Sequence, residues 1–250
     1  MEKQIAIIIP ARYGSSRLEG KPLLKANNKP IIQWVWEKAK NCPLVDRVIV
    51  ATDDDRIFNA CKEFGAEVEM TSTEHKSGSD RIAEVAKRHP EIGYIINLQG
   101  DEPLIEQENI ELVIKGVLYD EQADISTLIR KIDDVDEINN PNLVKCVFDV
   151  NNYAMYFSRS KIPFERGANE NNSQGKWNFY GHLGIYGFKR DALFKMTSLE
   201  QAPYEMAESL EQLRALQNGM KIKVSIVNNV PVGIDTLEDF EKFKLMVEKK

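Results

Sequence analysis

The sequence predicts one α/β domain with a mostly parallel β-sheet in its front half and a mixed sheet in the lobe behind it. Up to residue 119, short β-rich runs alternate with stretches of helical spacing, which is typical of successive βαβ units. After residue 125, several β-rich runs follow closely on one another, which indicates a mixed sheet. Because no linker of different composition separates the halves, we expect a single domain of 250 residues.

The front half, residues 1–125, begins with the apolar run Gln4–Pro10, the mark of a strand buried on both faces. The next elements are then predicted in chain order: a helix at Ile31–Lys40, a strand at Val48–Ala51, a helix at Asp54–Phe64 that Gly65 stops, a strand at Glu67–Met70, a helix at Arg81–Arg88, a strand at Tyr94–Leu98 and a helix at Glu106–Tyr119. This alternation predicts a Rossmann-like front half.

The lobe, about residues 126–220, and the closing segment 221–250 have a different order of elements. Strands are predicted at Ile125–Ile132, Leu143–Val150, Ala154–Ser158 and Gly181–Phe188, with a long mobile loop at Gly167–Asn178. Helices are predicted near Arg190–Thr197 and at Tyr204–Asn218, followed by a strand at Lys221–Val227. Thr236 and Asp239 have the spacing of a capping box that opens the last helix.

Composition excludes several classes of function. The chain has 33 Lys and Arg against 39 Asp and Glu, a net charge of -6, so we expect no general nucleic-acid binding. The apolar run Ile5–Ile9 is too short for a signal peptide or a membrane span, so no membrane association is expected. The three cysteines are widely spaced and form no CxxC pair, which favours a reducing cytoplasm without disulfides or a zinc site.

The loop at residues 10–22 follows the first strand and therefore lies at the carboxyl edge of the sheet, where open α/β sheets bind ligands. Gly14 and Gly20 allow the backbone N–H groups to face an anion, while Arg12, Arg17 and Lys21 add positive charge. These features predict a phosphate-binding loop, with a solvated basic loop as the alternative. Five residues separate the two glycines, and a proline follows the lysine, which argues against a P-loop. The sequence also has no G-x-G-x-x-G motif after a strand, which argues against a dinucleotide-binding site.

Two aspartates are candidate metal ligands. Asp101 ends the segment 97–101 at the same edge of the sheet, and a carboxylate that faces a phosphate site favours Mg²⁺. A turn aspartate is an equally good interpretation. Asp235 is either a second metal ligand or a residue that precedes the last helix. The run Asp53–Asp55 is interpreted as an acidic helix N-terminus rather than a metal motif.

The segment 75–81 is rich in side chains that form hydrogen bonds. Ser77, Ser79 and Arg81 suit contacts to a base or a phosphate, and the alternative is a Ser/Gly turn that ends in a helix cap. Farther along the chain, His182 and Tyr186 lie four residues apart in a predicted strand and so share a face, although such residues are more often structural.

The predicted helix 204–218 has a leucine face at Leu210, Leu213 and Leu216. Glu211, Gln212 and Arg214 lie on its other faces, and the pattern predicts that these are exposed to solvent.

Seven ordered segments together resemble the 3-deoxy-manno-octulosonate cytidylyltransferases, also called CMP-Kdo synthetases. They are spread along nearly the whole chain and are Pro10–Leu23, Ser77–Arg81, Asn97–Pro103, Met155–Pro163, His182–Tyr186, Glu208–Arg214 and Gly233–Thr236. Each segment alone would be a weak signal, whereas the ordered set is specific.

The resemblance implies a nucleotidyltransferase fold and a Mg²⁺-dependent reaction of CTP with 3-deoxy-manno-octulosonate (Kdo), which yields CMP-Kdo and pyrophosphate for lipopolysaccharide or capsule synthesis. It also implies a homodimer that forms through the back lobe. It assigns triphosphate binding and catalysis to Arg12, Arg17 and Lys21 beside the Pro10–Ala11 backbone, and metal binding to Asp101 and Asp235. It assigns the nucleoside to Ser77, Ser79, Arg81 and Gln99, and the sugar acid to Gln99, Arg159, His182, Tyr186, Glu211 and Gln212.

With these roles we expect direct in-line displacement, because the sequence offers no candidate for a covalent nucleophile. A related acid such as 8-amino-Kdo is the alternative substrate; a metal-dependent glycosyltransferase and a nucleotide-binding protein without turnover are the other classes considered. Two positions depart from the family pattern. Glu19 stands where the family has proline, and we expect its charge to loosen the phosphate loop or repel nucleotide. Ser79 replaces threonine and keeps the hydroxyl.

Overall fold

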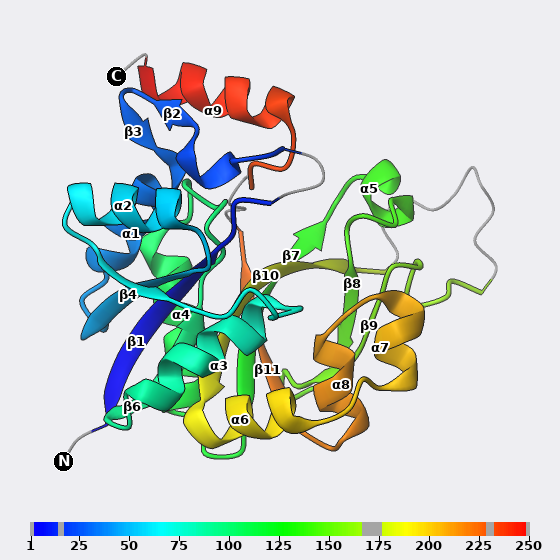
Figure 1. The fold of residues 1–250 in the computed structure, drawn as a ribbon. Coiled ribbons are helices and arrows are strands. Elements are labelled where there is room, and N and C mark those ends of the chain that lie inside the picture. Colours follow the sequence, from blue (N-terminus) through cyan, green and yellow to red (C-terminus); the bar gives the residue numbers. More distant parts are fainter. Residues whose placement is uncertain (1–2, 15–17, 167–176, 229–232, 249–250) are drawn as a thin grey trace.

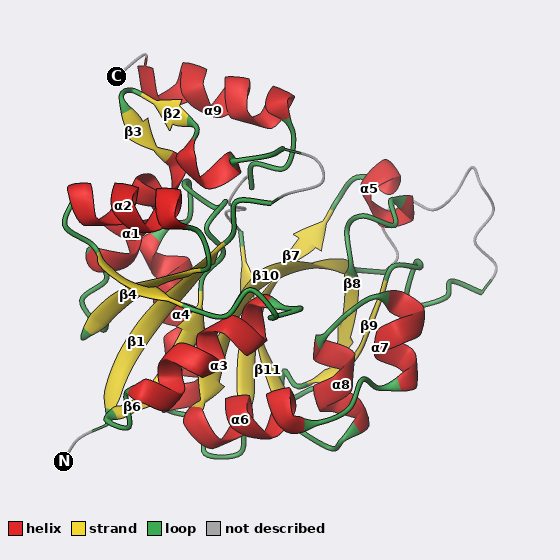
Figure 2. Cartoon of the chain, viewed as in Figure 1, coloured by secondary structure: helices red, strands yellow, loops and turns green. Residues whose placement is uncertain are grey.

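The computed structural model describes residues 3–14, 18–166, 177–228 and 233–248. In this part of the chain, a nine-stranded sheet carries helices on both faces, and a two-stranded hairpin lies apart from it (Figures 1 and 2). Arg17 and residues 167–176 of the predicted mobile loop lie outside the described residues. No helix in the described ranges is long and apolar enough to cross a membrane.

The front half of the sheet is parallel, as predicted. Strand β1 (Gln4–Ala11) pairs with β4 (Arg47–Thr52) on one side and with β6 (Ile92–Asn97) on the other, and β4 pairs with β5 (Glu67–Met70). Along the chain, β4 and β5 are therefore added on one side of β1, and β6 is then added on its other side. This reversal leaves a crevice at the carboxyl ends of β1 and β6, where ligands of such sheets bind.

The lobe makes the sheet mixed, which confirms the predicted fold class. Strand β10 (Phe179–Lys189) is antiparallel to both β6 and β7 (Ile125–Ile132), while β11 (Ile222–Val227) is parallel to β7. Strands β8 (Lys145–Phe148) and β9 (Ala154–Ser158) form an antiparallel pair that joins β10 through β8.

Strand β1 lies at the centre of the core. Ile7 and Ile9 belong to one apolar cluster with α1 (Ile31–Lys40), α2 (Asp55–Glu63) and α4 (Gln107–Leu118). Ile8 belongs to the cluster on the other face with α3 (Gly78–Arg88) and α6 (Arg190–Ser198). All three isoleucines are fully buried, and each such side chain contributes about 1.5–3 kcal/mol of hydrophobic stabilisation. The prediction of a strand buried on both faces is confirmed.

The predicted ends of several helices are confirmed by their hydrogen bonds. Before α9 (Leu237–Glu248), the Asp239 backbone N–H donates to Thr236 Oγ1 over 3.2 Å, and the Thr236 N–H donates to Asp239 Oδ2 over 2.9 Å, as a capping box requires. Asp54 caps α2 by accepting the Arg56 N–H, so the acidic run does mark a helix start. Gly65 and Gly219 have left-handed backbones, with φ of 80° and 72°.

The prediction of one helix over residues 204–218 is wrong. The structure has two short helices, α7 (Pro203–Glu208) and α8 (Gln212–Gln217). Ser209 between them adopts a left-handed conformation with φ of 52°, which ends α7. Helix α8 contacts both α7 and β9, so it is buried on more than one face.

Four short elements were not predicted. Strands β2 (Lys25–Ala26) and β3 (Lys29–Pro30) form a hairpin beside α9, and the 3-10 helix η1 spans Lys21–Leu23. Helix α5 (Val135–Asn139) begins after the Asp134 cap. The hairpin did have a signal, because Asn27 and Asn28 tolerate the positive φ angles of its two-residue turn.

Candidate active site

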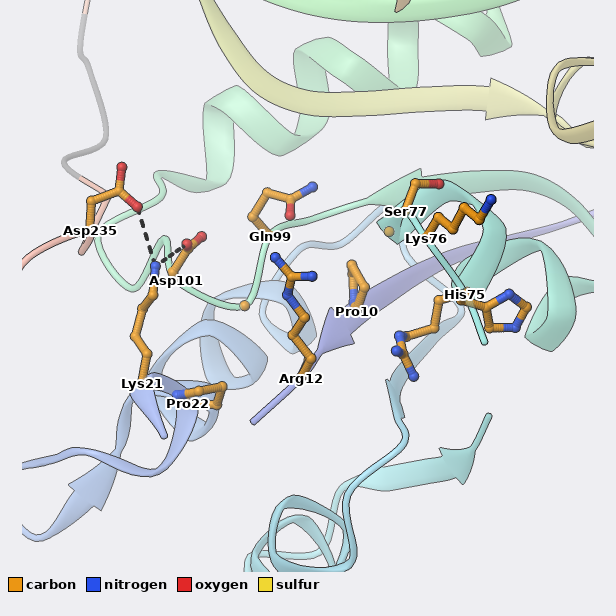
Figure 3. A pocket seen from close by; sticks show the side chains of 14 residues that line it. Pro10, Arg12, Lys21, Pro22, His75, Lys76, Ser77, Gln99, Asp101 and Asp235 are labelled. Carbon is orange, nitrogen blue, oxygen red and sulfur yellow. Dashed lines mark hydrogen bonds and ion pairs between the residues drawn. The ribbon is translucent and has the colours of Figure 1, made fainter. Parts of the chain in front are cut away.

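A cavity of about 300 Å³ lies at the carboxyl ends of β1 and β6, in the crevice that the sheet topology creates. Figure 3 shows its lining from segments far apart in the chain. These residues are Pro10, Ala11, Arg12, Lys21, Pro22, His75, Lys76, Ser77, Gly78, Arg81, Gln99, Gly100, Asp101 and Asp235. The cavity therefore brings together most of the residues that the resemblance assigns to the nucleotide and the metal.

Lys21 joins the two candidate metal ligands. Its Nζ donates to Asp101 Oδ2 over 2.7 Å and to Asp235 Oδ1 over 3.3 Å (Figure 3). The Lys21 side chain is largely buried, whereas that of Asp101 is partly exposed and that of Asp235 is about half exposed, so water reaches the carboxylate side of these ion pairs. Gly20 sets the turn that delivers the lysine, because its φ is 66° and an added Cβ would lie 3.0 Å from the Tyr13 ring.

A third carboxyl group, that of Glu102, lies beside these aspartates. Glu102 follows Asp101, and its Oε2 is buried without a hydrogen-bond partner in the described part of the chain. Burial, together with the charges of Asp101 and Asp235, raises the pKa of Glu102 to about 8. Two convergent carboxylates are the oxygen ligands that Mg²⁺ uses in proteins together with substrate phosphates. The residues present therefore fit a magnesium-type ion.

We expect Glu102→Gln to stabilise the protein in a pH-dependent way. In the unfolded chain this carboxyl ionises above pH 4.5, whereas the folded protein keeps it protonated up to about pH 8. The wild-type free energy of unfolding therefore falls as the pH rises through this window. Glutamine is neutral throughout, so the variant should gain at least about 1 kcal/mol over the wild type at pH 8 but nothing at pH 4.5. Urea unfolding at both values checks this; an equal difference at both would contradict it.

The phosphate loop places Arg12 inside the cavity. In Figure 3 its side chain points toward Gln99, which follows β6. Among the described residues, Arg12 has no carboxylate partner, so its charge is available to an anionic ligand. Lys76 and His75 also line the cavity and were missed. Both residues belong to the segment 75–81, in which only Ser77, Ser79 and Arg81 were predicted to contact a ligand.

Glu19 is exposed and is not among the residues that line the cavity. The sequence-based expectation is that it loosens the adjoining loop. Glu19→Pro should then lower the KM for CTP by about 2- to 5-fold, the range expected when a proline removes conformational freedom from a compatible loop. Steady-state kinetics with varied CTP measures this, and an unchanged KM would show that Glu19 has no such effect.

The segment 75–81 has a divided role. Ser77 caps α3, because its hydroxyl accepts the Asp80 N–H over 3.1 Å, as the turn-and-cap interpretation predicted. Arg81 reaches the cavity but is buried, with its Nη2 2.6 Å from Asp53 Oδ2. Ser79 does not line the cavity; its hydroxyl donates to Glu211 Oε2 over 2.8 Å.

His182 and Tyr186 share one face of β10, as predicted, with ring centroids 5.3 Å apart. Burial lowers the pKa of His182 to about 3, so the imidazole is neutral, and its Nε2 lies 3.0 Å from Thr127 Oγ1. Burial, followed by the nearby Glu211 charge, raises the pKa of Tyr186. These rings lie beside the cavity rather than in its lining.

The prediction that Glu211, Gln212 and Arg214 face solvent is wrong. Helix α8 contacts both α7 and β9 and is buried on more than one face, so Gln212 is only 6% exposed, and Arg214 forms a buried ion pair with Glu205. Glu211 Oε1 and Gln212 Nε2 are buried and have no hydrogen-bond partner among the described residues. Two adjacent unsatisfied polar groups indicate a place for a polar ligand.

Arg159 follows β9 and contacts residues 208 and 209, which lie just before Glu211 in the chain. Its guanidinium donates to three backbone carbonyls, those of Glu208 at 2.7 Å, Pro141 at 3.2 Å and Ser209 at 3.3 Å. Arg159 does not line the described cavity. The structure therefore arranges the candidate residues as a nucleotide end and a second polar end, which meet at the Ser79–Glu211 hydrogen bond.

Comparisons with known proteins agree with this geometry. The family model for cytidylyltransferases matches residues 6–222. The chain is 48% identical to the 3-deoxy-manno-octulosonate cytidylyltransferase of Thermodesulfovibrio yellowstonii, over 94% of both chains. It is 47% identical to the enzyme of the same name from Fusobacterium nucleatum, over 94% of this chain and 93% of the relative.

Solved structures give the same result. A CMP:2-keto-3-deoxy-manno-octonic acid synthetase in complex with CTP superposes with a TM-score of 0.92 at 41% identity, covering 99% of this chain and 100% of the other. A 4-diphosphocytidyl-2C-methyl-D-erythritol synthase from Anaerococcus prevotii has a TM-score of 0.62 at 14% identity, over 99% and 97% of the chains, and shares the fold alone. This chain belongs to the cytidylyltransferase family and, within it, to the 3-deoxy-manno-octulosonate cytidylyltransferases.

Proposed function

We propose that the protein transfers CMP from CTP to the anomeric hydroxyl of Kdo and releases pyrophosphate, with Mg²⁺ as the metal. One observation carries this proposal: Lys21, Asp101 and Asp235 converge in the cavity that the phosphate loop borders. The relatives at 47–48% identity bear the name of this reaction, and the solved relative at 41% identity was obtained with CTP.

The nucleotide end binds CTP. Arg12 and Lys21, together with Arg17, hold the triphosphate above the Pro10–Ala11 backbone. Ser77 and Arg81 hold the nucleoside from the start of α3, and Gln99 lies between the two substrates. This assignment is supported by the cavity, which Arg12, Lys21, Ser77, Arg81 and Gln99 all line. Ser79 acts indirectly, by holding Glu211.

Asp101 and Asp235 hold the metal, which supplies Lewis-acid stabilisation of the phosphate charge and lowers the repulsion that the incoming hydroxyl meets. Lys21 and Arg12 stabilise the charge that develops on the α-phosphate and on the departing pyrophosphate. The described lining contains no cysteine, the Ser77 hydroxyl donates to Asp80 Oδ2 over 3.0 Å, and the His75 ring is paired with Glu84. The sugar hydroxyl therefore attacks phosphorus directly, in line with the leaving group.

The second polar end binds the sugar acid. Arg159 suits the carboxylate, because a planar guanidinium binds carboxylates through two parallel hydrogen bonds. Glu211 and Gln212 offer the unsatisfied polar atoms that sugar hydroxyls need. His182 remains neutral at physiological pH and, with Tyr186, forms an aromatic wall. A related acid such as 8-amino-Kdo would use the same carboxylate contact.

We also propose a homodimer formed through the back lobe. Large apolar side chains are exposed there, including Val150 at 98%, Met155, Phe164 and Met206. Exposed apolar side chains mark protein–protein contact sites where they form a contiguous patch. Sedimentation equilibrium should give twice the 28.6 kDa of one chain, and a single-chain mass would contradict the proposal. The three buried free cysteines are consistent with a cytoplasmic role in lipopolysaccharide or capsule synthesis.

The direct test is pyrophosphate release from CTP and Mg²⁺ with Kdo, 8-amino-Kdo, N-acetylneuraminate or no acceptor. We expect release with Kdo and none without an acceptor. Release only with N-acetylneuraminate would move the substrate to the sialic-type acids. CTP binding without release in any arm would contradict an enzymatic role with these acids.

A further inference from the structure

The guanidinium of Arg159 is held by main-chain groups rather than by a carboxylate. Nε donates to the Glu208 carbonyl, Nη1 to the Pro141 carbonyl and Nη2 to the Ser209 carbonyl. A guanidinium has five N–H donors, so one remains on each terminal nitrogen. Neutral carbonyls fix the plane of the group but do not neutralise its charge. Arg159 is therefore orientated while its charge is available for an anion.

The Glu208 carboxylate contacts Arg159 through the backbone rather than through the guanidinium. Its Oε2 accepts the Arg159 N–H over 2.9 Å, and its Oε1 accepts the Ser158 hydroxyl over 2.6 Å. Glu208 thereby fastens the end of β9 to the end of α7. It also places its own carbonyl, and that of Ser209, where the guanidinium needs them.

Lys145 fixes the other side of the same segment. Its side chain is 0% exposed, and its Nζ donates to the carbonyls of Asn140 at 2.9 Å, Leu143 at 2.7 Å and Arg159 at 2.6 Å. All three ammonium donors are used, and none of them meets a carboxylate. Burying a charge in this way is costly, and an apolar side chain of similar size would often stabilise such a site equally well. The arrangement is therefore explained better by positioning than by stability.

We propose that Lys145 and Glu208 are positioning residues that hold Arg159 in place for the carboxylate of the sugar acid. This inference rests on the proposed function and extends it to two residues that do not line the cavity. Lys145 fixes the Arg159 carbonyl and the turn before β8, which includes the Pro141 region. Glu208 fixes the Arg159 N–H and the two carbonyls from the break between α7 and α8.

The two residues should influence one substrate and not the other. Both lie at the sugar-acid end, whereas the triphosphate contacts come from the phosphate loop. Loss of either should therefore raise the KM for Kdo by about 10-fold, the size expected when a charge-assisted contact to a substrate is misplaced. The KM for CTP should stay within about 2-fold of the wild-type value, because the variants disturb only the sugar-acid end. General damage to the structure would instead raise the KM values for both substrates.

The experiment compares Lys145→Met and Glu208→Gln with the wild type, varying Kdo at saturating CTP and then the reverse. Lys189→Met is the matched control, because Lys189 also donates to two backbone carbonyls, those of Asp120 and Glu121, but has no contact with Arg159. The control should leave the KM for Kdo unchanged. If Lys145→Met fails to fold, the Glu208→Gln kinetics alone test the inference. This variant should fold, because the glutamine carbonyl can still accept one of the two hydrogen bonds that Glu208 accepts from Ser158 and Arg159.

An Arg159→Ala background separates positioning from general damage. If Glu208 acts through Arg159, Glu208→Gln should add no further rise in the KM for Kdo once the guanidinium is absent. An equal rise in both backgrounds, or an unchanged KM for Kdo in the folded single variants, would overturn the inference. Failure of the proposed function is distinguishable: wild-type protein would then release no pyrophosphate with any Kdo-type acid, and the positioning role would fall with it.

Discussion

Asp101→Asn is expected to lower kcat/KM for CTP by about 10³-fold, the upper end for removing one group that stabilises transition-state charge. Asparagine keeps the shape of the side chain but removes the charge that pairs with Lys21 Nζ at 2.7 Å. It also removes one of the two carboxylates that we propose as metal ligands, so the phosphate charge would be less well neutralised. Pyrophosphate release at saturating Kdo, with varied CTP and Mg²⁺, measures the loss.

Asp134→Asn is the matched control. Asp134 caps α5 by accepting the Asp136 N–H over 2.9 Å, and asparagine caps helices equally well. This variant should keep wild-type kinetics. If Asp101→Asn kept more than about a tenth of the wild-type kcat/KM, the loss would be too small for a metal ligand, and the assignment of Asp101 would be wrong.

Arg214→Leu is expected to lower the free energy of unfolding by about 3–5 kcal/mol at pH 7, the usual effect of removing one partner of a buried ion pair. Glu205 is 4% exposed and Arg214 7%, and Arg214 Nε and Nη2 donate to the two Glu205 oxygens over 2.8 and 2.5 Å. The variant leaves the Glu205 carboxylate buried without its counter-ion. Urea unfolding measures the change.

The pH dependence of this effect has a definite sign. Burial raises the pKa of Glu205, but the hydrogen bonds from Arg214 and the Ala202 N–H outweigh it, so the pKa lies below its usual 4.5. Such a carboxylate contributes stability above the unfolded pKa that is lost as the pH falls through the folded value. The destabilisation by Arg214→Leu should therefore shrink toward pH 4. A loss of equal size at pH 4 and pH 7 would show that packing, not charge, is responsible.

The parallel half of the fold could be predicted because its signals are local. The continuous apolar run of β1 and the helical spacing of α1 require no knowledge of distant residues. The break at Ser209 could not be predicted in this way, since the leucines that carry the helical spacing all follow Ser209 and do not show where the helix begins. What ends α7 is a left-handed serine whose neighbours are tied to Arg159, about 50 residues earlier in the chain.

The candidate site divides in the same way. Lys21 and Asp101 were predicted to meet because the carboxyl ends of β1 and β6 lie at one edge of the sheet. Asp235 was ambiguous in sequence and lies 3.3 Å from Lys21 in the structure. Glu211 and Gln212 are buried because α8 packs against both α7 and β9, which the pattern of one amphipathic helix does not reveal, and only the resemblance placed them near a substrate.

In the proposed reaction, a sugar-acid hydroxyl attacks the α-phosphorus of CTP in the cavity that Lys21, Asp101 and Asp235 help to line. Phosphorus NMR of CTP, Mg²⁺ and Kdo with the wild-type enzyme tests it most directly. We expect two products to appear in equal amounts as CTP disappears: the phosphodiester that joins CMP to the sugar acid, and pyrophosphate. Neither product should appear without Kdo. Orthophosphate as the product, or consumption of CTP at the same rate without the acid, would contradict it.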